Sequence, residues 1–246
     1  MWGIIPAAGS GSRIQPLAFS KELLPVGSRF DGKTERPRAV SEYLVERMIK
    51  AGVKKICFVI SPGKSDIMEY YGQGNSEAHF CYTVQQHPQG LCDAIFSAVP
   101  FIGKSENVLI GLPDTIWFPE EGLCDLPEDR LSFLLFPVDH PEFFDAVVTD
   151  NNENVLRIEV KQKDAHSSWI WGAFSMPGLV LHELYSLWKD RGKKDEYMGT
   201  LINAYIDLGG HAKALRKGHS YVDVGTLNGY REAINLLYSK QKVALG

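Results

Sequence analysis

Two patterns of apolar positions alternate along the first half of the chain. Amphipathic stretches have helical spacing, and the clearest is Arg38–Ala51, which places its apolar side chains on one face and stops before Gly52. A second such stretch is Leu91–Val99. Short continuous apolar runs, which are typical of strands buried on both faces, occupy Trp2–Ala7, Lys55–Ser61, Phe80–Gln85 and Asn107–Leu112. The alternation predicts an α/β fold with a largely parallel sheet and helices on both faces.

The second half of the chain orders its elements differently, with strands grouped together. Asn151-Asn152 predicts a hairpin turn between two of them. The polar stretch Gly27–Pro37 predicts a loop, either a mobile flap near an active site or a surface excursion. The pattern predicts strands at Leu131–Val138, Ala146–Asp150, Val155–Lys161, Trp169–Met176 and Tyr221–Val224, and helices at Pro177–Lys189, Tyr197–Leu208 and Leu227–Lys240.

Composition narrows the class of protein. Of the 246 residues, 44% are apolar and 23% are charged, which is ordinary for a globular protein with a packed core. The net charge of −4 leaves no electrostatic footprint for nucleic acid or an acidic membrane surface. We therefore expect a single domain over residues 1–246, with no nucleic-acid or membrane partner.

The cysteines and the first residues indicate a cytoplasmic protein. None of the cysteines forms a C-x-x-C pair, and most lie in apolar runs, which favours buried, reduced thiols. The opening MWGIIPAAGSGSR has no basic leader, and no apolar run approaches the length of a membrane span. The cysteines are Cys57, Cys81, Cys92 and Cys124.

Chemistry-bearing residues follow two of the predicted strands. A loop rich in Gly and Ser, Ala8–Pro16, follows the first strand, and Asp114 follows the strand at Asn107–Leu112. Ligands of parallel sheets sit at the carboxyl ends of strands, so these two features are expected at one edge of the sheet.

The segment Gly3–Gly27 carries the strongest signal for phosphate binding. Glycines let backbone N–H groups approach phosphate oxygens, Arg13 adds a fork of donors, and Lys21 adds a compact cation. No G-K-[ST] follows, so the loop is not a Walker loop, and Arg13 stands where a dinucleotide fingerprint needs its third glycine. Taken alone, a glycine loop favours the simpler interpretation, a tight surface turn carrying two solvated cations.

The whole segment resembles the signature of the sugar-phosphate nucleotidyltransferases, G-x-G-x-R-x-x-P-L followed by P-K-x-L-L-P. Residues 9–13, 16–17 and 21–26 match it. The chain is most similar to glucose-1-phosphate thymidylyltransferases, with features of UTP–glucose-1-phosphate uridylyltransferases in residues 5–9 and 112–114. Two departures are a short Arg13–Lys21 spacing and Ser20 in place of a proline.

This resemblance implies a Rossmann-like three-layer α/β/α fold with a mostly parallel central sheet and a smaller mixed lobe for the sugar. The nucleotide half would be residues 1–115 and the sugar-phosphate half residues 116–246. It makes Arg13 and Lys21 catalytic and assigns the nucleotide to Ala8, Gly9, Ser10, Gly11, Ser12, Gln85 and Gly90.

The base and the metal ion each have a matching motif. In VQQHPQGLCDAI, the family's glutamine and glycine meet a pyrimidine base, and a side-chain amide can both donate to and accept from an imide edge. Thymine and uracil are not distinguished by this contact. The aspartate of LPD and that of the late D-x-G motif bind magnesium in the family; here they are Asp114 and Asp223. A turn residue and a helix cap are the alternative roles for these two aspartates.

The sugar side matches the family less well. Lys161 would hold the sugar phosphate, but Val160 replaces a glutamate that bonds sugar hydroxyls, and Asp145 stands where the family has a glycine. A different sugar or a local slip of the match would explain these changes. The resemblance assigns the sugar phosphate to Asp145, Glu159, Lys161, Gly172 and Tyr221.

The resulting hypothesis is a magnesium-dependent enzyme that joins a pyrimidine nucleoside triphosphate to a sugar 1-phosphate and releases pyrophosphate. A phosphate is already largely ionised at neutral pH, so the nucleophile needs no general base. Two alternatives stay open: a binding regulator without turnover, and a glycosyltransferase that uses a nucleotide sugar. The sequence leaves the oligomeric state open, including a homo-oligomer.

Overall fold

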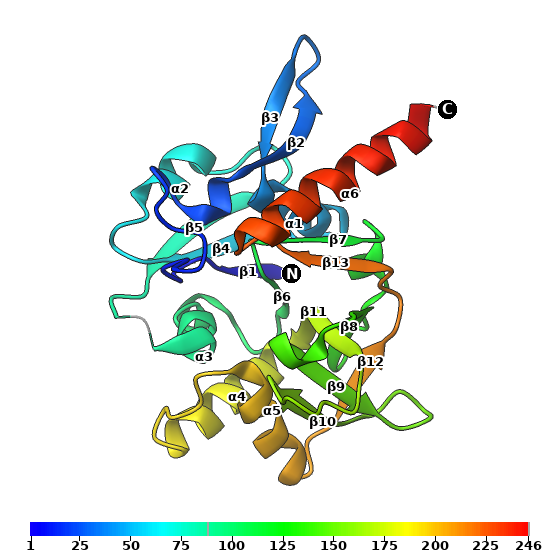
Figure 1. Ribbon diagram of the computed structural model, residues 1–246. Coiled ribbons are helices and arrows are strands. Elements are labelled where there is room, and N and C mark those ends of the chain that lie inside the picture. Colours follow the sequence, from blue (N-terminus) through cyan, green and yellow to red (C-terminus); the bar gives the residue numbers. More distant parts are fainter. Residues whose placement is uncertain (88, 246) are drawn as a thin grey trace.

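The computed structural model describes residues 1–87 and 89–245, and its centre is a nine-stranded sheet (Figure 1). The strand order is β10-β9-β11-β6-β1-β4-β5, with β8 paired to β11 and β12 paired to β8. The run β6-β1-β4-β5 is parallel, whereas β11 joins β6 antiparallel and opens the mixed part of the sheet. The strands are β1 Trp2–Pro6, β4 Lys55–Ile60, β5 His79–Val84, β6 Asn107–Gly111, β8 Leu131–Pro137, β9 Asp145–Thr149, β10 Val155–Val160, β11 Trp169–Pro177 and β12 Ala212–Leu215.

Helices cover both faces of this sheet, as the apolar runs predicted. Successive residues of a strand point to opposite faces, and Ile4 and Ile5 accordingly join different cores. Ile5 packs with α1 and α2, and Ile4 packs with the face covered by α3, α4 and α5. The helices are α1 Val40–Lys50, α2 Ser65–Tyr71, α3 Gly90–Phe96, α4 Gly178–Asp190 and α5 Met198–Asp207. The fold is therefore the expected three-layer α/β arrangement.

A small second sheet closes the molecule beside the first. Its strands are β7, Thr115–Phe118, and β13, Ser220–Asp223, and they run antiparallel. Helix α6, Leu227–Leu245, packs Ala233 and Leu237 against these strands. This sheet pairs the segment just after β6 with β13, which lies far later in the sequence. The boundary proposed at residue 115 stays a prediction.

The prediction of a loop at 27–37 is wrong. The segment is a β-hairpin of β2, Pro25–Phe30, and β3, Glu35–Ala39, and it extends away from the body of the molecule (Figure 1). Its turn is held locally, because the Asp31 carboxylate accepts hydrogen bonds from the backbone N–H groups of Lys33 and Thr34. The hairpin is a surface projection and not a flap over the sheet edge.

Other boundaries differ for local reasons. The helix expected at Leu91–Val99 ends at Phe96, and a 3₁₀ turn over Val99–Phe101 follows where Pro100 breaks the α-helix. The strands β7 and β12 and helix α2 were not predicted, and each is seven residues or shorter, too short for its periodicity to stand out. The turn at Asn151-Asn152 is confirmed, with the Asp150 carboxylate accepting from Asn152 and Asn154.

Two whole-chain expectations can be compared with the structure. All four cysteines are free; Cys57 and Cys92 are buried, Cys81 is half-buried, and Cys124 is exposed. Among the helices of the described residues, none combines the length and apolar character that crossing a membrane requires.

Candidate active site

The site forms at the carboxyl edge of the parallel strands. Strand β1 leads into the loop 7–20, and its neighbour β6 leads into Asp114. Asp223 arrives through the small sheet, where it pairs with Thr115, and Val224 N donates to Asp114 O at 2.9 Å. The β7–β13 ladder thus places the two aspartates side by side although they lie far apart in sequence.

Each aspartate meets one of the two cations that the sequence singled out. Arg13 Nη2 lies 2.9 Å from Asp223 Oδ2, and Lys21 Nζ lies 2.5 Å from Asp114 Oδ2. Gly225 shows how closely the two pairs approach one another. A Cβ on this glycine would lie 2.8 Å from Asp223 Oδ1, 3.3 Å from Asp114 Oδ2 and 3.2 Å from Arg13 Nη2. Both carboxylates and a guanidinium therefore surround one small space that the bare backbone keeps free.

The charge states of Lys21 and Asp114 follow from their contact with each other and from their burial. Burial acts to raise the pKa of Asp114, but the Lys21 ammonium outweighs it and holds that pKa below its usual value. Burial acts to lower the pKa of Lys21, and the Asp114 carboxylate outweighs it in the opposite direction. Both groups are consequently charged at neutral pH. Beneath them, burial and then the charges of Asp223 and Asp114 raise the pKa of Tyr221 well above its usual value, so this phenol stays neutral.

The glycine loop presents its polar face to solvent while its ends are anchored. Gly9, Ser10 and Ser12 are exposed, whereas Ala8 is buried. Gly11 adopts a φ of 65°, which favours glycine, and a Cβ there would lie 2.9 Å from Lys21 Cδ. The loop therefore packs on the aliphatic part of the Lys21 side chain, so the positions of the loop and of this cation depend on each other.

The short segment around Lys21 is held by two contacts that sequence reasoning missed. Ser20, which replaces the expected proline, donates to the Asp66 carboxylate from its backbone N at 2.6 Å and from its Oγ at 2.7 Å. Glu22, 1% exposed, accepts from Lys64 Nζ at 2.8 Å on both carboxylate oxygens. Lys64 Nζ also donates to Ala7 O at 2.7 Å. The motif gave no signal for Lys64 or Asp66, because both lie on a different element.

Gln85 and Gly90 lie together at the end of β5 and the start of α3. Gln85 Nε2 donates to Asp93 Oδ2 at 2.7 Å and to Gly90 O at 3.3 Å. A Cβ on Gly90 would lie 2.5 Å from Glu196 O, and the φ of 89° also favours glycine. Contact with the Glu196 backbone thus accounts for this glycine, and its contact with a base stays a prediction. The motif VQQHPQGLCDAI contains Asp93, but the resemblance had given this residue no role.

The opposite wall carries the residues assigned to the sugar. Asp145 begins β9 and faces Val160 across the β9–β10 ladder, and burial raises its pKa. Gly199 at the start of α5 makes room for it, since a Cβ there would lie 3.0 Å from Asp145 Oδ2. Lys161 has a φ of 46° and carries its Nζ 4.4 Å from the Tyr197 ring centroid. A strained backbone of this kind is common at functional sites.

Tyr221, Gly172 and Glu159 are placed differently from one another. The Tyr221 ring packs on Phe136 and Phe144, and Gly172 allows this because its Cβ would lie 2.8 Å from Tyr221 Cε2. Glu159 is fully buried, and its carboxylate accepts from Arg157, from His166 N at 2.7 Å and, through its other oxygen, from His166 Nδ1 at 2.8 Å. These contacts occupy Glu159 within the protein, and its assignment to the sugar phosphate stays a prediction.

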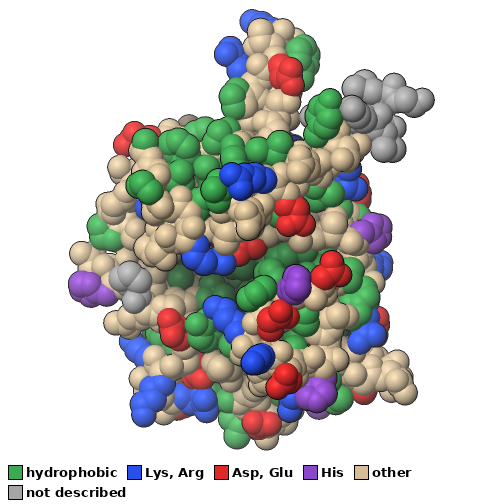
Figure 2. All heavy atoms as spheres, viewed as in Figure 1, with side chains coloured by type: hydrophobic (Ala, Val, Ile, Leu, Met, Phe, Trp, Pro, Cys, Tyr) green, Lys and Arg blue, Asp and Glu red, His purple; other side chains and the backbone are tan. Residues whose placement is uncertain are grey.

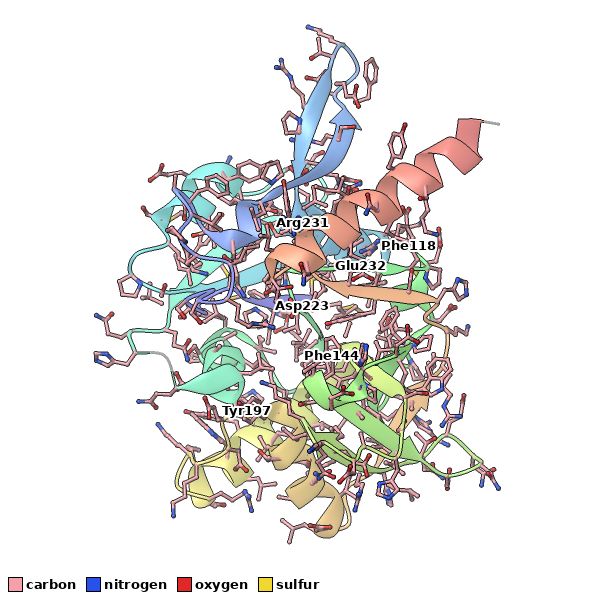
Figure 3. The ribbon with its side chains drawn as sticks, in the orientation of Figure 1. Phe118, Phe144, Tyr197, Asp223, Arg231 and Glu232 are labelled. Atoms are coloured by element: carbon pink, nitrogen blue, oxygen red, sulfur yellow. The ribbon has the colours of Figure 1, made fainter. Side chains whose placement is uncertain are left out.

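The two walls enclose a cleft. Figure 2 shows this face of the molecule hollowed between its upper and lower parts, with charged side chains at the rim. In Figure 3, Asp223 lies on the upper side of the cleft, and Phe144 and Tyr197 lie on the lower side. The cleft therefore brings the phosphate-binding candidates of one half opposite the sugar candidates of the other.

The donor set suits a hard divalent cation that is shared with a ligand. Asp114 and Asp223 offer carboxylate oxygens around the space beside Gly225. Magnesium prefers oxygen donors and commonly takes one or two carboxylates together with substrate phosphates. Within the described part of the chain, no three His, Cys, Asp or Glu side chains gather into a metal site. Two carboxylates are thus an incomplete set that phosphate oxygens would complete.

Comparison with known proteins agrees with this arrangement. A model of the nucleotidyl transferase family matches residues 2–240. A glucose-1-phosphate thymidylyltransferase of Neisseria gonorrhoeae is 27% identical over 258 residues, which cover 99% of this chain and 84% of that protein. A UTP–glucose-1-phosphate uridylyltransferase of Mycoplasma pneumoniae is 29% identical over 142 residues, covering 48% of this chain and 45% of that protein.

The fold comparison points the same way. The UTP-bound UGPase of Acinetobacter baumannii superposes with a TM-score of 0.77, covers 96% of this chain and 92% of its own, and shares 20% of its residues. At this identity the likeness is one of fold.

Proposed function

Since the chain belongs to the nucleotidyl transferase family, we propose that it joins a nucleoside triphosphate to a sugar 1-phosphate, forming a nucleoside diphosphate sugar and pyrophosphate. The observation that carries the proposal is the grouping of Arg13, Lys21, Asp114 and Asp223 around one space at the carboxyl edge of the sheet. A polyphosphate and a divalent cation are the ligands that such a mixture of guanidinium, ammonium and carboxylates would hold together.

The reaction needs positioning and charge stabilisation more than proton transfer. A phosphate oxygen of the sugar 1-phosphate attacks the α-phosphorus in line, the bond to the β-phosphate oxygen breaks, and pyrophosphate leaves with that electron pair. Arg13 and Lys21 neutralise the charge that grows on the triphosphate. Lys161, on the opposite wall, holds the attacking phosphate as a point charge. No histidine or serine base takes part.

Both cations must exchange partners when substrate arrives. Without substrate, Arg13 is paired with Asp223 and Lys21 with Asp114. Asp114 and Asp223 would hold Mg²⁺, which supplies charge neutralisation and orientation of the phosphates when bound. The carboxylates thus keep Arg13 and Lys21 in place until phosphate oxygens of the substrate take over as partners of the two cations.

Pyrophosphate release tests the proposal. The protein is mixed with MgCl₂, UTP or dTTP and glucose 1-phosphate, and pyrophosphate is followed with a coupled assay. Release that requires the metal, the triphosphate and the sugar phosphate together is the expected result. Binding of nucleotide without release would instead indicate a regulator, and transfer of sugar from a nucleotide sugar without pyrophosphate would indicate a glycosyltransferase.

The residues assigned to the sugar depart most from the family pattern, and the same assay identifies the sugar. The Val160 side chain offers no hydrogen bond, and Asp145 places a half-buried carboxyl where the family has a glycine. A panel of sugar 1-phosphates therefore accompanies glucose 1-phosphate in the experiment. We further propose that the protein acts in the cytoplasm, on the basis of its free cysteines.

A further inference from the structure

Ser20 is the residue at which the exposed glycine loop returns to the body of the protein. Residues 9–19 are all exposed or half-buried, whereas Ser20 is 6% exposed. Its carbonyl oxygen accepts from Leu23 N at 2.9 Å, so Ser20 begins the 3₁₀ turn Lys21–Leu23. Because Lys21 follows Ser20 directly, the position of Ser20 determines where the Lys21 side chain leaves the backbone.

Asp66 of α2 holds Ser20 through both of its carboxylate oxygens. Oδ2 accepts from Ser20 N at 2.6 Å, and Oδ1 accepts from Ser20 Oγ at 2.7 Å. The backbone N–H and the hydroxyl are the two donors that a serine has, so both are used on one side chain. Hydrogen bonds to an ionised carboxylate are roughly twice as strong as those between neutral groups. The Asp66 side chain is itself held at the start of α2, since Oδ1 also accepts from Ile67 N at 3.0 Å.

The backbone at Ser20 suits a proline, but the neighbouring side chain does not. The φ of −62° at Ser20 matches the value that a proline ring imposes. In proline a ring carbon takes the place of the amide hydrogen, and Ser20 N lies only 2.6 Å from Asp66 Oδ2. The ring would collide with this oxygen. The proline that the family has at this position and the Asp66 contact therefore exclude each other in this fold.

We propose that Asp66 is a positioning residue for the triphosphate: its two hydrogen bonds to Ser20 take the place of the family proline and hold Lys21 against the phosphates. The inference rests on the proposed function, in which Lys21 neutralises the charge of the triphosphate. A proline restricts its own backbone, whereas a serine is free to rotate about φ. In this chain the carboxylate of a neighbouring helix supplies the missing restraint.

The need for this restraint follows from the place of Lys21 in the site. Its ammonium lies 2.5 Å from Asp114 Oδ2, and its side chain is only 15% exposed. Charge stabilisation depends on distance and orientation, so a turn that moves freely would weaken the contact with the phosphates. Lys161, which approaches the Tyr197 ring, lies on the opposite wall. Loss of Asp66 should therefore affect the triphosphate and spare the sugar phosphate.

The first experiment replaces Asp66 with alanine (D66A), alone and together with Lys21→Met (K21M). Pyrophosphate release gives kcat and KM for the better of UTP and dTTP and for glucose 1-phosphate, and titration with the same triphosphate and MgCl₂ gives its dissociation constant. In D66A, kcat/KM for the triphosphate should fall by about tenfold or more, while KM for glucose 1-phosphate stays within about twofold of the native value.

The K21M background distinguishes positioning from stability. D66A should cause no further loss there, because Asp66 acts through Lys21. A residue that only stabilised the fold would lower activity by the same factor in both backgrounds.

The second experiment restores the family proline. Ser20→Pro (S20P) alone should lose more activity than D66A, because the ring collides with the Asp66 carboxylate. The S20P/D66A double variant removes the colliding side chain and supplies the ring, so its kcat/KM should exceed that of either single variant. Glu69→Ala (E69A) removes an exposed acid from the same helix and should behave as the native chain.

Three results would overturn the inference: native kcat/KM in D66A, the same fractional loss from D66A with and without Lys21, or an S20P/D66A variant no more active than D66A. If the proline variants do not fold, D66A and its combination with K21M decide. If even the native chain releases no pyrophosphate, the proposed function fails separately, and the dissociation constants decide. Triphosphate binding that D66A weakens only when Lys21 is present supports the inference. Unchanged constants, or no binding of either triphosphate, contradict it.

Discussion

At the scale of single residues, the site holds its charges in opposite pairs. Lys21 and Asp114 are only 15% and 13% exposed in their side chains, so neither charge is well solvated without the other. Arg13 is 63% exposed, and its pair with Asp223 is a contact of low stability that a ligand can displace. The Lys21–Asp114 pair therefore fixes the geometry, and under the proposed function the Arg13–Asp223 pair is the one that a triphosphate would displace.

Replacing Asp114 with asparagine tests this division. The amide keeps the size of the side chain and an acceptor for Lys21 but removes the charge that would hold Mg²⁺. We expect metal-dependent pyrophosphate release to fall by about a hundredfold or more, because metal-ion charge stabilisation contributes several kcal/mol. Far-ultraviolet circular dichroism and thermal unfolding check that the fold is retained. Turnover equal to that of the native chain would place the metal ion elsewhere.

At the scale of elements, the buried pair of Glu22 and Lys64 connects three segments. Glu22 lies in the 3₁₀ turn Lys21–Leu23, Lys64 immediately precedes α2, and Lys64 Nζ reaches the end of β1 at Ala7 O. Asp66 adds a second connection from α2 to Ser20. Lys21 is positioned by these contacts, since its own turn is fixed from both sides.

A double-mutant cycle measures what this pair contributes. Glu22→Gln or Lys64→Met alone leaves a buried charge without its partner, so each should lower the free energy of unfolding by about 3–5 kcal/mol. The double variant removes both charges and should recover much of that loss. Urea denaturation gives the four free energies. Additive effects of the two changes would mean that the pair does not couple these elements.

At the scale of the whole molecule, the cleft lies between two walls that one nine-stranded sheet connects. The lower wall includes Glu159 in β10, which binds Arg157 of the same strand and His166 of the following loop. Burial acts to raise the pKa of Glu159, but Arg157 and the His166 backbone N–H outweigh it and lower the pKa to about 2. A carboxyl of this kind contributes stability only while it is ionised.

The sign of the resulting pH dependence is fixed by that shift. In the unfolded chain a glutamate has a pKa of about 4.3, so the unfolded state takes up the proton first as the pH falls. The stabilisation by Glu159 is complete above that pH and is lost as the pH falls toward about 2. Free energies of unfolding are measured from about pH 6 down to about pH 2. They should fall less steeply for Glu159→Gln than for the native chain. Parallel curves would contradict the assignment.

The local pattern of apolar residues was enough to predict most helices and strands. It also placed the glycine loop and Asp114 at the same edge of the sheet. The apolar runs at β1, β4 and β6 carry their own burial signal, because a strand covered on both faces must be apolar throughout. The run at β5 was also found, although this strand lies at the edge of the sheet and is only half-buried. The loop after β1 and Asp114 after β6 were placed together on the same reasoning, since neighbouring parallel strands end at one edge. The hairpin over residues 25–39 escaped because its exposed strands have no apolar face to reveal them.

What only the tertiary structure decided are the contacts between distant segments. Asp223 reaches Asp114 through the β7–β13 ladder, and the Asp93 carboxylate accepts from the Gln85 amide. A sequence states which groups a segment carries, because burial and turn preferences are local. Which partner a polar side chain meets, and which of its atoms are then left for a ligand, depends on elements that fold together across the chain.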